Sequence, residues 1–251
     1  MTDAAARPAP DLDGNDWALF LDIDGTLLDY AEHPDAVVVS DDLRDLLAGL
    51  EKKFGGALAF VTGRSVATVD RLFSPLLLPA AGIFGLEHRL RPDGPVEAIG
   101  EQADLEALAD ELEAEFAGQG VYIERKGPVL GVHTRTANHL LPRATELVEE
   151  ALARLPKGYR MLHGNIGFEL KPLEAVKGSA IRRFMKETPF AGRRPAFLGD
   201  DTSDEHGFEA VNDAGGLSIR VRPNGPTVAG HTLPGVAETL RWLERQLSAR
   251  N

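Results

Sequence analysis

The chain has 251 residues, no cysteine and a net charge of −12, from 39 acidic and 27 basic side chains. Its hydrophobic fraction of 43% and charged fraction of 26% are typical of a soluble globular protein. The acidic balance argues against a nucleic-acid partner, because affinity for a phosphate backbone depends on Lys and Arg. The lack of cysteine excludes disulfides, zinc–thiolate sites and cysteine nucleophiles.

The sequence also predicts that the protein has no membrane partner. No apolar run reaches the roughly 18 to 20 residues that a membrane span requires. The opening residues lack the basic and apolar segments of a secretory signal, so we expect a cytoplasmic location. Residues 1–15 are rich in Ala, Pro and Asp without periodicity, and they predict a flexible tail.

Residues 16–92 alternate between strand and helix patterns. The apolar run WALFLDID predicts a strand of a covered parallel sheet that ends in charge. Residues 41–53 place leucines at helical spacing after Ser40, a good N-cap residue. A second strand is predicted in GALAFVTGR and a second helix in SVATVDRLF. This alternation predicts an α/β fold with a doubly wound parallel sheet and right-handed crossovers.

The middle of the chain has a different pattern. Amphipathic helices are predicted over 102–117 and 142–155, and each is followed by a hairpin. The first hairpin, VYIERKGPVLGVHTR, turns at Gly127–Pro128, and the second, YRMLHGNIGFELK, turns at Gly164–Asn165. Two helix–hairpin units predict an α+β domain with an antiparallel sheet.

This α+β domain interrupts the parallel fold. From Ala175 onward the helix–strand alternation returns, with predicted strands in RPAFLGDD and GLSIRV. We therefore expect a cap domain, residues 93–170, inserted into a catalytic core formed by residues 16–92 and 171–251.

Polar side chains follow the predicted strands of the core. Ligands of open α/β sheets bind beyond the carboxyl ends of the strands, where several segments converge. The candidates there are Asp22 and Asp24, Thr62, Lys177 at a helix start, and Asp200, Asp201 and Asp204. Carboxylate oxygens suit Mg²⁺, which usually binds one or two carboxylates together with water and phosphate. The set therefore predicts a site for Mg²⁺ and a phosphoryl group.

Each signal alone has a simpler interpretation. Asp-x-Asp is common in loops, Thr-Gly-Arg carries little information, and Lys177 fits an exposed side chain at a helix start. The segment DDTSDE resembles a helix-capping box, with Thr202 or Ser203 as the cap. The order of the four signals, each at a predicted strand end or helix start, favours a single site.

The four motifs, Asp-x-Asp-Gly-Thr, Thr-Gly-Arg, Lys and Gly-Asp-Asp-x-x-Asp-Glu, resemble those of the haloacid dehalogenase superfamily of phosphotransferases. Within it, the chain is similar to the trehalose-6-phosphate phosphatases through GLEHR, ERKGPVLGVHTR, FELKP and FLGDDTSDE, over roughly residues 17–245. Two positions depart from that pattern, Phe84 in place of His and Thr134 in place of Tyr. These departures bear on the sugar pocket rather than on the chemistry.

The resemblance and the residue types together predict the chemical roles. Asp22 would attack phosphorus to form an aspartyl-phosphate. Asp24 would protonate the leaving oxygen and then activate the hydrolytic water. The phosphoryl oxygens would be held by Thr62, Lys177 and backbone amides after Asp24, with Gly25, Thr26, Gly63 and Arg64 lining the substrate. The metal ligands would be Asp22, the Asp24 carbonyl and Asp200, supported by Asp201 and Asp204.

Recognition of the sugar is expected in the cap. Glu124 and Lys126 alternate along a predicted strand and so share a face, and Glu169 comes from the second hairpin. His133 and Arg135 share the alternation of the neighbouring strand. Charges on an exposed sheet face are more often only solvated, which is the competing interpretation.

The predicted function is Mg²⁺-dependent hydrolysis of trehalose 6-phosphate, a small-molecule sugar phosphate, by a protein for which a monomer is favoured. Another sugar-phosphate phosphatase of the superfamily, acting on mannosyl-phosphoglycerate or sucrose phosphate, is the nearest alternative. A phospho-acceptor signalling domain would also use strand-end acids and a Lys, but it needs neither the insertion nor Asp24. A binding module without activity is the third alternative.

Overall fold

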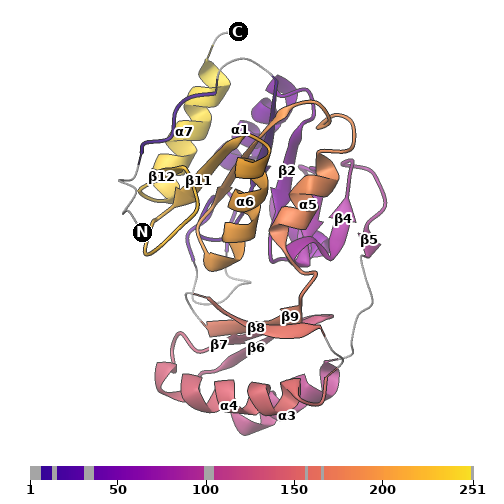
Figure 1. Ribbon diagram of the computed structural model, residues 1–251, viewed down its shortest axis with the longest axis vertical. Helices are drawn as coiled ribbons and strands as arrows, with labels where there is room; N and C mark the ends of the chain where they lie inside the picture. Colours follow the sequence, from indigo (N-terminus) through magenta and orange to yellow (C-terminus); the bar gives the residue numbers. More distant parts are fainter. Residues whose placement is uncertain are drawn as a thin grey trace. The chain divides into compact units, whose positions relative to one another are not determined.

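A computed structural model describes residues 7–12, 16–30, 37–98, 105–155, 158–164 and 167–249. The chain divides into two compact units (Figure 1). The core unit comprises Met1–Ala98 and Val176–Asn251, and the cap unit comprises Ile99–Ala175.

The core unit is built on an eight-stranded sheet in the order β12-β11-β10-β1-β2-β3-β4-β5. All neighbours from β12 to β3 are parallel, while β4 and β5 run antiparallel at one edge. The strands are β1 (Trp17–Leu21), β2 (Leu58–Val61), β3 (Ala80–Gly82), β4 (Glu87–Arg89), β5 (Glu97–Ala98), β10 (Arg194–Gly199), β11 (Leu217–Val221) and β12 (His231–Leu233). The predicted doubly wound α/β core is confirmed.

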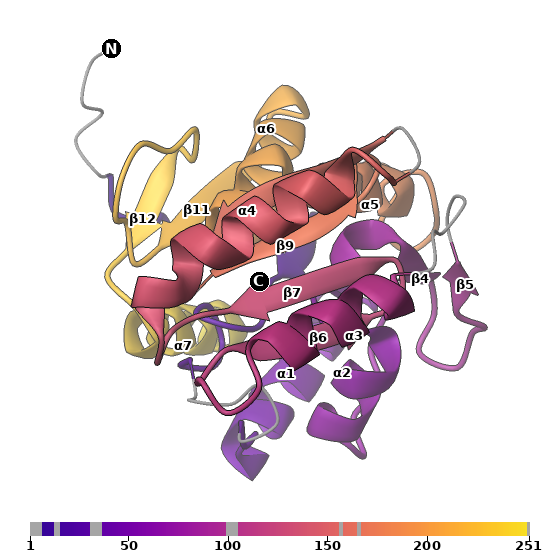
Figure 2. The same ribbon diagram turned by 90° about the horizontal axis from the view of Figure 1, so that it is seen from below.

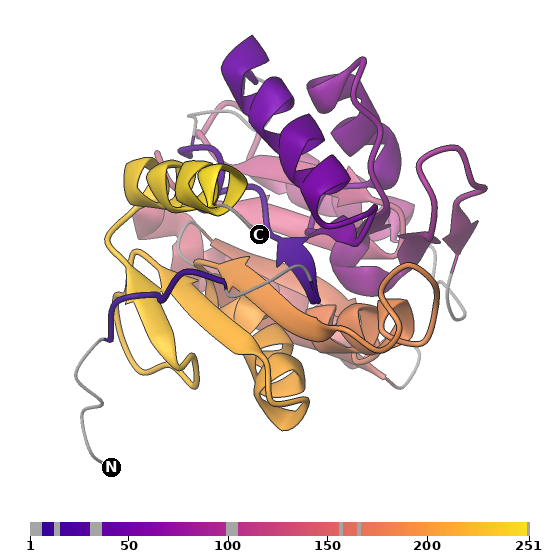
Figure 3. The ribbon, with the colours of Figure 1, turned by 90° about the horizontal axis from the view of Figure 1, so that it is seen from above.

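Helices cover both faces of this sheet, as Figure 3 shows from above. Leu19 and Leu21 of β1 belong to the apolar cluster that includes Trp242, whereas Ala18 and Phe20 belong to the cluster that includes Phe208. Because successive residues of a strand point to opposite faces, a strand covered on both sides is apolar throughout. The helices are α1 (Asp41–Lys53), α2 (Val66–Phe73), α5 (Lys177–Phe184), α6 (Glu205–Asp213) and α7 (Val236–Ser248), with short 3₁₀ segments η2 (Ile83–Gly85) and η4 (Thr202–Asp204).

The cap unit is a four-stranded antiparallel sheet in the order β6-β7-β9-β8, with two helices on one face (Figure 2). Alternate strand residues such as Ile123, Val132 and Phe168 pack with Leu112 and Val148 of the helices in one apolar cluster. The elements are α3 (Glu106–Glu115), β6 (Tyr122–Lys126), β7 (Val129–His133), η3 (Asn138–Leu140), α4 (Leu141–Leu152), β8 (Tyr159–Gly164) and β9 (Gly167–Pro172). Both expected helix–hairpin units are present, although residues 102–104 of the first expected helix and Asn165 of the second turn lie outside the described residues.

The amino-terminal residues differ from the expected flexible tail. Pro8 forms a parallel β-bridge with Thr232 of β12. The Pro10 carbonyl accepts a hydrogen bond of 3.0 Å from Trp242 Nε1. The Leu12 amide donates to Gln246 Oε1 at 2.7 Å. Residues 7–12 are therefore docked on the core unit, because a Trp and a Gln of α7 offer partners to their backbone. Residues 1–6 and 13–15 lie outside the described part of the chain.

The boundary between the units also differs from the expected residues 93–170. Strand β5 pairs with β4, with Glu87 opposite Ala98, so residues 93–98 stay with the core unit. At the other end the cap unit extends to Ala175. Among the described helices, none combines the length and the apolar character needed to cross a bilayer.

Candidate active site

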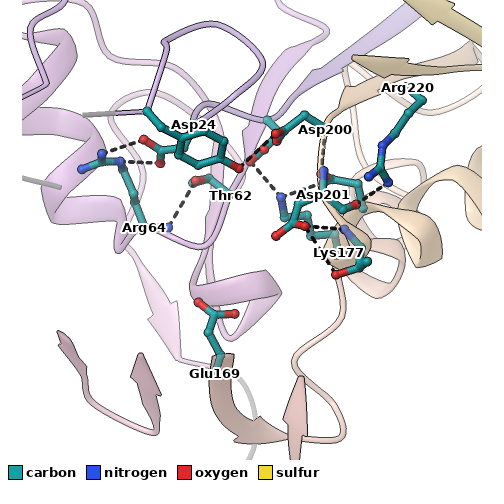
Figure 4. Close-up of polar contacts among 12 residues, drawn as sticks. Asp24, Thr62, Arg64, Glu169, Lys177, Asp200, Asp201 and Arg220 are labelled. Carbon is teal, nitrogen blue, oxygen red and sulfur yellow. Dashed lines mark hydrogen bonds and ion pairs between the residues drawn. The ribbon is translucent and has the colours of Figure 1, made fainter. Parts of the chain in front are cut away.

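Acidic residues and one lysine of the core unit meet where the strands end (Figure 4). Asp22 follows β1, Asp200 follows β10, and Lys177 is the first residue of α5. Carboxylate oxygens of Asp22, Asp200 and Asp204 lie within 4.8 Å of one another, and all three residues are buried. The structure thus brings together residues that are as much as 182 positions apart in the sequence.

Lys177 is the centre of this cluster. Its Nζ lies 2.8 Å from Asp22 Oδ1 and 2.7 Å from Asp204 Oδ1, and its side chain is 2% exposed. Burial alone would lower the pKa of the ammonium, but the charges of Asp204 and Asp22 outweigh it and raise that pKa. Lys177 therefore stays charged and holds Asp22 in place.

Asp204 has a supporting position. Its Oδ2 accepts hydrogen bonds of 2.9 Å from the amides of both Asp200 and Asp201, while its Oδ1 faces Lys177. The Asp201 side chain accepts in turn from the Asp204 backbone, which completes a capping box at η4, and it also accepts from the Thr202 amide at 2.8 Å. The capping interpretation of this segment is thus correct, but the cap is Asp201 rather than Thr202 or Ser203, and it also orients the lysine.

The two carboxylate oxygens of Asp200 differ in their hydrogen bonds. Its Oδ2 accepts a hydrogen bond of 3.0 Å from the Tyr30 hydroxyl, whereas its buried Oδ1 has no hydrogen-bond partner among the described residues. Burial, together with the charge of Asp204, raises the pKa of Asp200 to about 7. Burial also raises the pKa of Asp22, and Lys177 offsets this only in part. A cation at these carboxylates would reverse both effects, so the donor set fits a hard ion such as Mg²⁺.

The loop after Asp24 approaches Asp200 closely. Gly25 has a φ of +79°, in the left-handed region, and a Cβ atom there would lie 2.1 Å from Asp200 Oδ2. The next residue, Thr26, is fully buried, and its hydroxyl has no hydrogen-bond partner in the described part of the chain. Only glycine allows this loop to lie against the three carboxylates of Asp22, Asp200 and Asp204, which we call the acidic cluster.

Asp24 is held by Arg64. The guanidinium donates to both carboxylate oxygens at 2.7 Å, from Nε to Oδ2 and from a terminal nitrogen to Oδ1. The Arg64 amide also donates to Thr62 Oγ1 at 3.2 Å. The two motifs Asp-x-Asp and Thr-Gly-Arg are therefore joined by a bidentate ion pair, a strong and geometrically specific contact.

The cap unit carries a second charged cluster on the sheet face opposite its helices. Lys126 Nζ lies 3.0 Å from Glu124 Oε2 and 3.1 Å from Glu169 Oε1. His133 Nε2 lies 2.8 Å from Glu124 Oε2. Burial would raise the pKa of Glu124, but the hydrogen bond from His133 and the charge of Lys126 lower it to about 2. We call these four residues the polar cap face.

Arg135 does not belong to the polar cap face. Strand β7 ends at His133, and Arg135 lies in the following turn with an exposed side chain. The expectation that Arg135 continues the strand alternation is wrong, because the chain leaves the sheet two residues earlier.

The comparison with known proteins decides the family. The family model described as trehalose-phosphatase matches residues 20–232, which include the whole acidic cluster. The chain belongs to the trehalose-phosphatase family. The expected enzyme class, a phosphoric monoester hydrolase, is thereby confirmed.

Named relatives agree with this family, and a solved structure has the same fold. The phosphatase is 47% identical over 242 residues to the "Probable trehalose-phosphate phosphatase" of Sinorhizobium fredii, covering 95% of this chain and 90% of that protein. It is 35% identical over 237 residues to the "Trehalose-6-phosphate phosphatase" of Escherichia coli, covering 91% and 85%. The C-terminal domain of C. albicans trehalose-6-phosphate phosphatase has the same fold, with a TM-score of 0.83 at 18% identity over 99% of this chain and 100% of that chain.

Two residues of the phosphatase site were not predicted from the sequence. Tyr30, which donates to Asp200, lies in a loop that carries no recognisable pattern. Arg220 of β11 donates to the Asp201 carbonyl at 2.8 Å and to Glu205 Oε1 at 2.7 Å. An arginine inside the apolar strand GLSIRV is a signal that could have identified Arg220, because buried charges are paired.

Proposed function

We propose that the phosphatase hydrolyses trehalose 6-phosphate to trehalose and phosphate, in a Mg²⁺-dependent reaction through an aspartyl-phosphate on Asp22. The observation that carries this proposal is the contact of Asp22 with Lys177, next to Asp200 Oδ1, which has no hydrogen-bond partner in the part of the chain that the structure describes. The family and the names of the relatives support the substrate.

Asp22 is the proposed nucleophile because Lys177 contacts one oxygen of its carboxylate. Lys177 binds Oδ1 at 2.8 Å, which orients the carboxylate and leaves Oδ2 as the oxygen that attacks phosphorus. The new bond joins Oδ2 to phosphorus, and the bond from phosphorus to the sugar oxygen breaks. The ammonium of Lys177 also offsets negative charge on the phosphoryl group in the transition state.

A divalent cation would be held by the Asp22 carboxylate, the Asp24 carbonyl and Asp200, where it would neutralise charge on the phosphoryl group. Asp201 and Asp204 would support this arrangement through the hydrogen bonds that position Asp200 and Lys177. Thr62 would bind a phosphoryl oxygen. The Gly25 and Thr26 amides donate to the carbonyls of Leu28 at 2.7 Å and Ile23 at 3.3 Å in this structure, so they would have to give up these bonds to bind phosphate.

Asp24 is the proposed general acid and base. Arg64 occupies both of its oxygens in this structure, so the carboxyl group must leave the guanidinium before it can donate a proton to the sugar oxygen. The same group then takes a proton from the water that attacks the aspartyl-phosphate. Arg64 would thus hold Asp24 until the carboxyl group moves to the substrate. This role adds to its predicted place beside the substrate.

The polar cap face is proposed to bind the sugar. Glu124, Lys126 and Glu169 combine acceptors and a donor on one sheet face, which is the pattern that sugar hydroxyls require. His133 extends the set, and Arg135 would contribute only from its turn.

We predict that the cap is a separate recognition domain. We also predict that the protein is cytoplasmic and monomeric.

Phosphate release from trehalose 6-phosphate tests this function. We expect turnover with Mg²⁺, no turnover in excess chelator, and recovery when Mg²⁺ is added back. Sucrose 6-phosphate and mannosyl-3-phosphoglycerate serve as competing substrates at equal concentration. A higher kcat/KM for either of them would transfer the proposal to that substrate, and full activity in chelator would overturn the metal assignment.

A further inference from the structure

The 3₁₀ segment Ile83–Gly85 of the core unit has an unusual backbone. Ile83 has a φ of +47° and Phe84 a φ of +56°, so two consecutive residues with a Cβ atom adopt the left-handed region. This region disfavours side chains, and a β-branched residue such as Ile83 is rare there. Strain of this kind is concentrated at functional sites, where the surrounding structure maintains it.

Two hydrogen bonds connect this segment to the Thr62–Arg64 loop. The Ile83 amide donates to the Arg64 carbonyl at 2.9 Å, and the Phe84 amide donates to the Thr62 carbonyl at 3.0 Å. The strained residues therefore fix the backbone of the loop that presents Thr62 and holds Asp24 through Arg64.

The Phe84 ring completes this contact. A Cβ atom on Gly63 would lie 2.6 Å from Phe84 Cζ and 2.9 Å from Cε1, so the ring rests on the Gly63 backbone. The ring centroid also lies 6.0 Å from Lys177 Nζ. Phe84 is itself buried, with 4% exposure.

The same segment also abuts the first turns of α5. A Cβ atom on Gly85 would lie 3.1 Å from Ala180 Cβ and 3.4 Å from the Val176 carbonyl oxygen. Lys177 begins this helix, so the segment Ile83–Gly85 lies between the loop with Thr62 and the helix with Lys177.

We propose that Phe84 is a positioning residue for phosphate binding. Its ring fixes the Thr62–Gly63 backbone on one side and presents an aromatic face to the Lys177 ammonium on the other. This role rests on the proposed phosphate-binding roles of Thr62 and Lys177. Because the Phe84 ring lies at Gly63 and near Lys177, its proposed effect is at the phosphoryl end and independent of the sugar, in contrast to the expectation that this position bears on the sugar pocket.

The test compares Phe84→Leu with Phe73→Leu, a matched variant that also replaces a buried ring but on α2, away from the acidic cluster. Three quantities are measured in Mg²⁺: the affinity for inorganic phosphate by calorimetry, and kcat/KM for trehalose 6-phosphate and for a small aryl phosphate. If Phe84→Leu does not fold, Phe84→Met, which retains a long apolar side chain, replaces it.

We expect Phe84→Leu to weaken phosphate binding and to lower both kcat/KM values by about the same factor, roughly 5- to 20-fold. Phe73→Leu should stay within about twofold of the parent in all three quantities. Parent-like phosphate affinity in Phe84→Leu, a loss confined to trehalose 6-phosphate, or an equal loss in Phe73→Leu would each overturn the proposal. If the parent hydrolyses neither substrate, the proposed function fails, and the phosphate affinities still decide the role of Phe84.

Discussion

The acidic cluster of the core unit and the polar cap face balance their charges in opposite ways. In the core, burial raises the pKa values of Asp22 and Asp200, and Lys177 offsets the cost only in part. In the cap, Lys126 lies between two glutamates, and His133 adds a hydrogen bond that helps to lower the pKa of Glu124 to about 2.

This difference indicates what each cluster lacks. Buried carboxylates with raised pKa values would be stabilised by an additional cation, such as the divalent metal ion of the proposed reaction. The two glutamates of the polar cap face already share the Lys126 ammonium, so this face can exchange internal hydrogen bonds for those of uncharged sugar hydroxyls. Variants of the two clusters should therefore differ in the kind of effect as well as in its size.

The largest effect is expected for Asp22→Asn. The amide keeps the volume of the side chain but cannot form an acyl-phosphate, so turnover should fall by roughly 1,000-fold or more. Because burial raises the pKa of Asp22 and Lys177 keeps its contact with Asp204, the thermal unfolding midpoint should equal or exceed that of the parent. Phosphate release and thermal unfolding are measured on the same preparation, and retained turnover would remove Asp22 from its role.

Lys177→Met and Lys126→Met compare the two lysines directly. The Lys177 side chain is 2% exposed and serves two buried aspartates, so its loss should destabilise the fold by about 3 kcal/mol and abolish activity. The Lys126 side chain is 11% exposed, and its loss leaves Glu169 without this contact while Glu124 keeps that with His133, so the loss should be smaller, about 1 to 2 kcal/mol. Chemical denaturation measures both values, and equal losses would contradict the comparison.

Chemistry and recognition should be separable by variants of the polar cap face. Glu169→Ala or Lys126→Ala should lower kcat/KM for trehalose 6-phosphate by roughly 10- to 100-fold, because hydrogen bonds to the sugar disappear. The same variants should hydrolyse a small aryl phosphate nearly as well as the parent. Unchanged turnover of trehalose 6-phosphate in both variants would show that these residues do not bind the sugar.

The smallest effect concerns the pH dependence of stability. The folded-state pKa of Glu124, about 2, lies below its ordinary value of 4.5, so its ionised form stabilises the fold. This contribution is fully present above about pH 4.5 and is lost as the pH falls toward 2. Glu124→Gln should therefore show a weaker fall in unfolding free energy between pH 4.5 and 2 than the parent. An identical slope in both proteins would contradict the lowered pKa.

The sequence predicted the long buried elements and the residues that follow them. Asp22, Asp200 and Lys177 could be predicted to meet because parallel strands end at one edge of the sheet. Strands β3, β4, β5 and β12 were not predicted, because two or three residues are too few to show a period. The left-handed Ile83 and Phe84 were not predicted either, since tertiary contacts impose a conformation that their residue types disfavour.

The cap shows a second limit of prediction. The shared face of Glu124 and Lys126 follows from alternation alone. The contact of Lys126 with Glu169 depends on the pairing of β7 with β9, which joins strands from two different hairpins. The hydrogen bond from Tyr30 to Asp200 joins residues 170 positions apart and has no local signal.

The central claim, that Asp22 carries the phosphoryl group, is tested most directly by trapping the intermediate. Asp24→Asn is mixed with an aryl phosphate labelled in its phosphoryl group, whose leaving group needs no proton from Asp24, and the reaction is quenched in acid within the first turnover. We predict stoichiometric, alkali-labile label on the peptide that contains Asp22, and none in the double variant Asp22→Asn, Asp24→Asn. Release of the aryl alcohol by Asp24→Asn without labelled protein, or equal labelling of the double variant, would contradict the account.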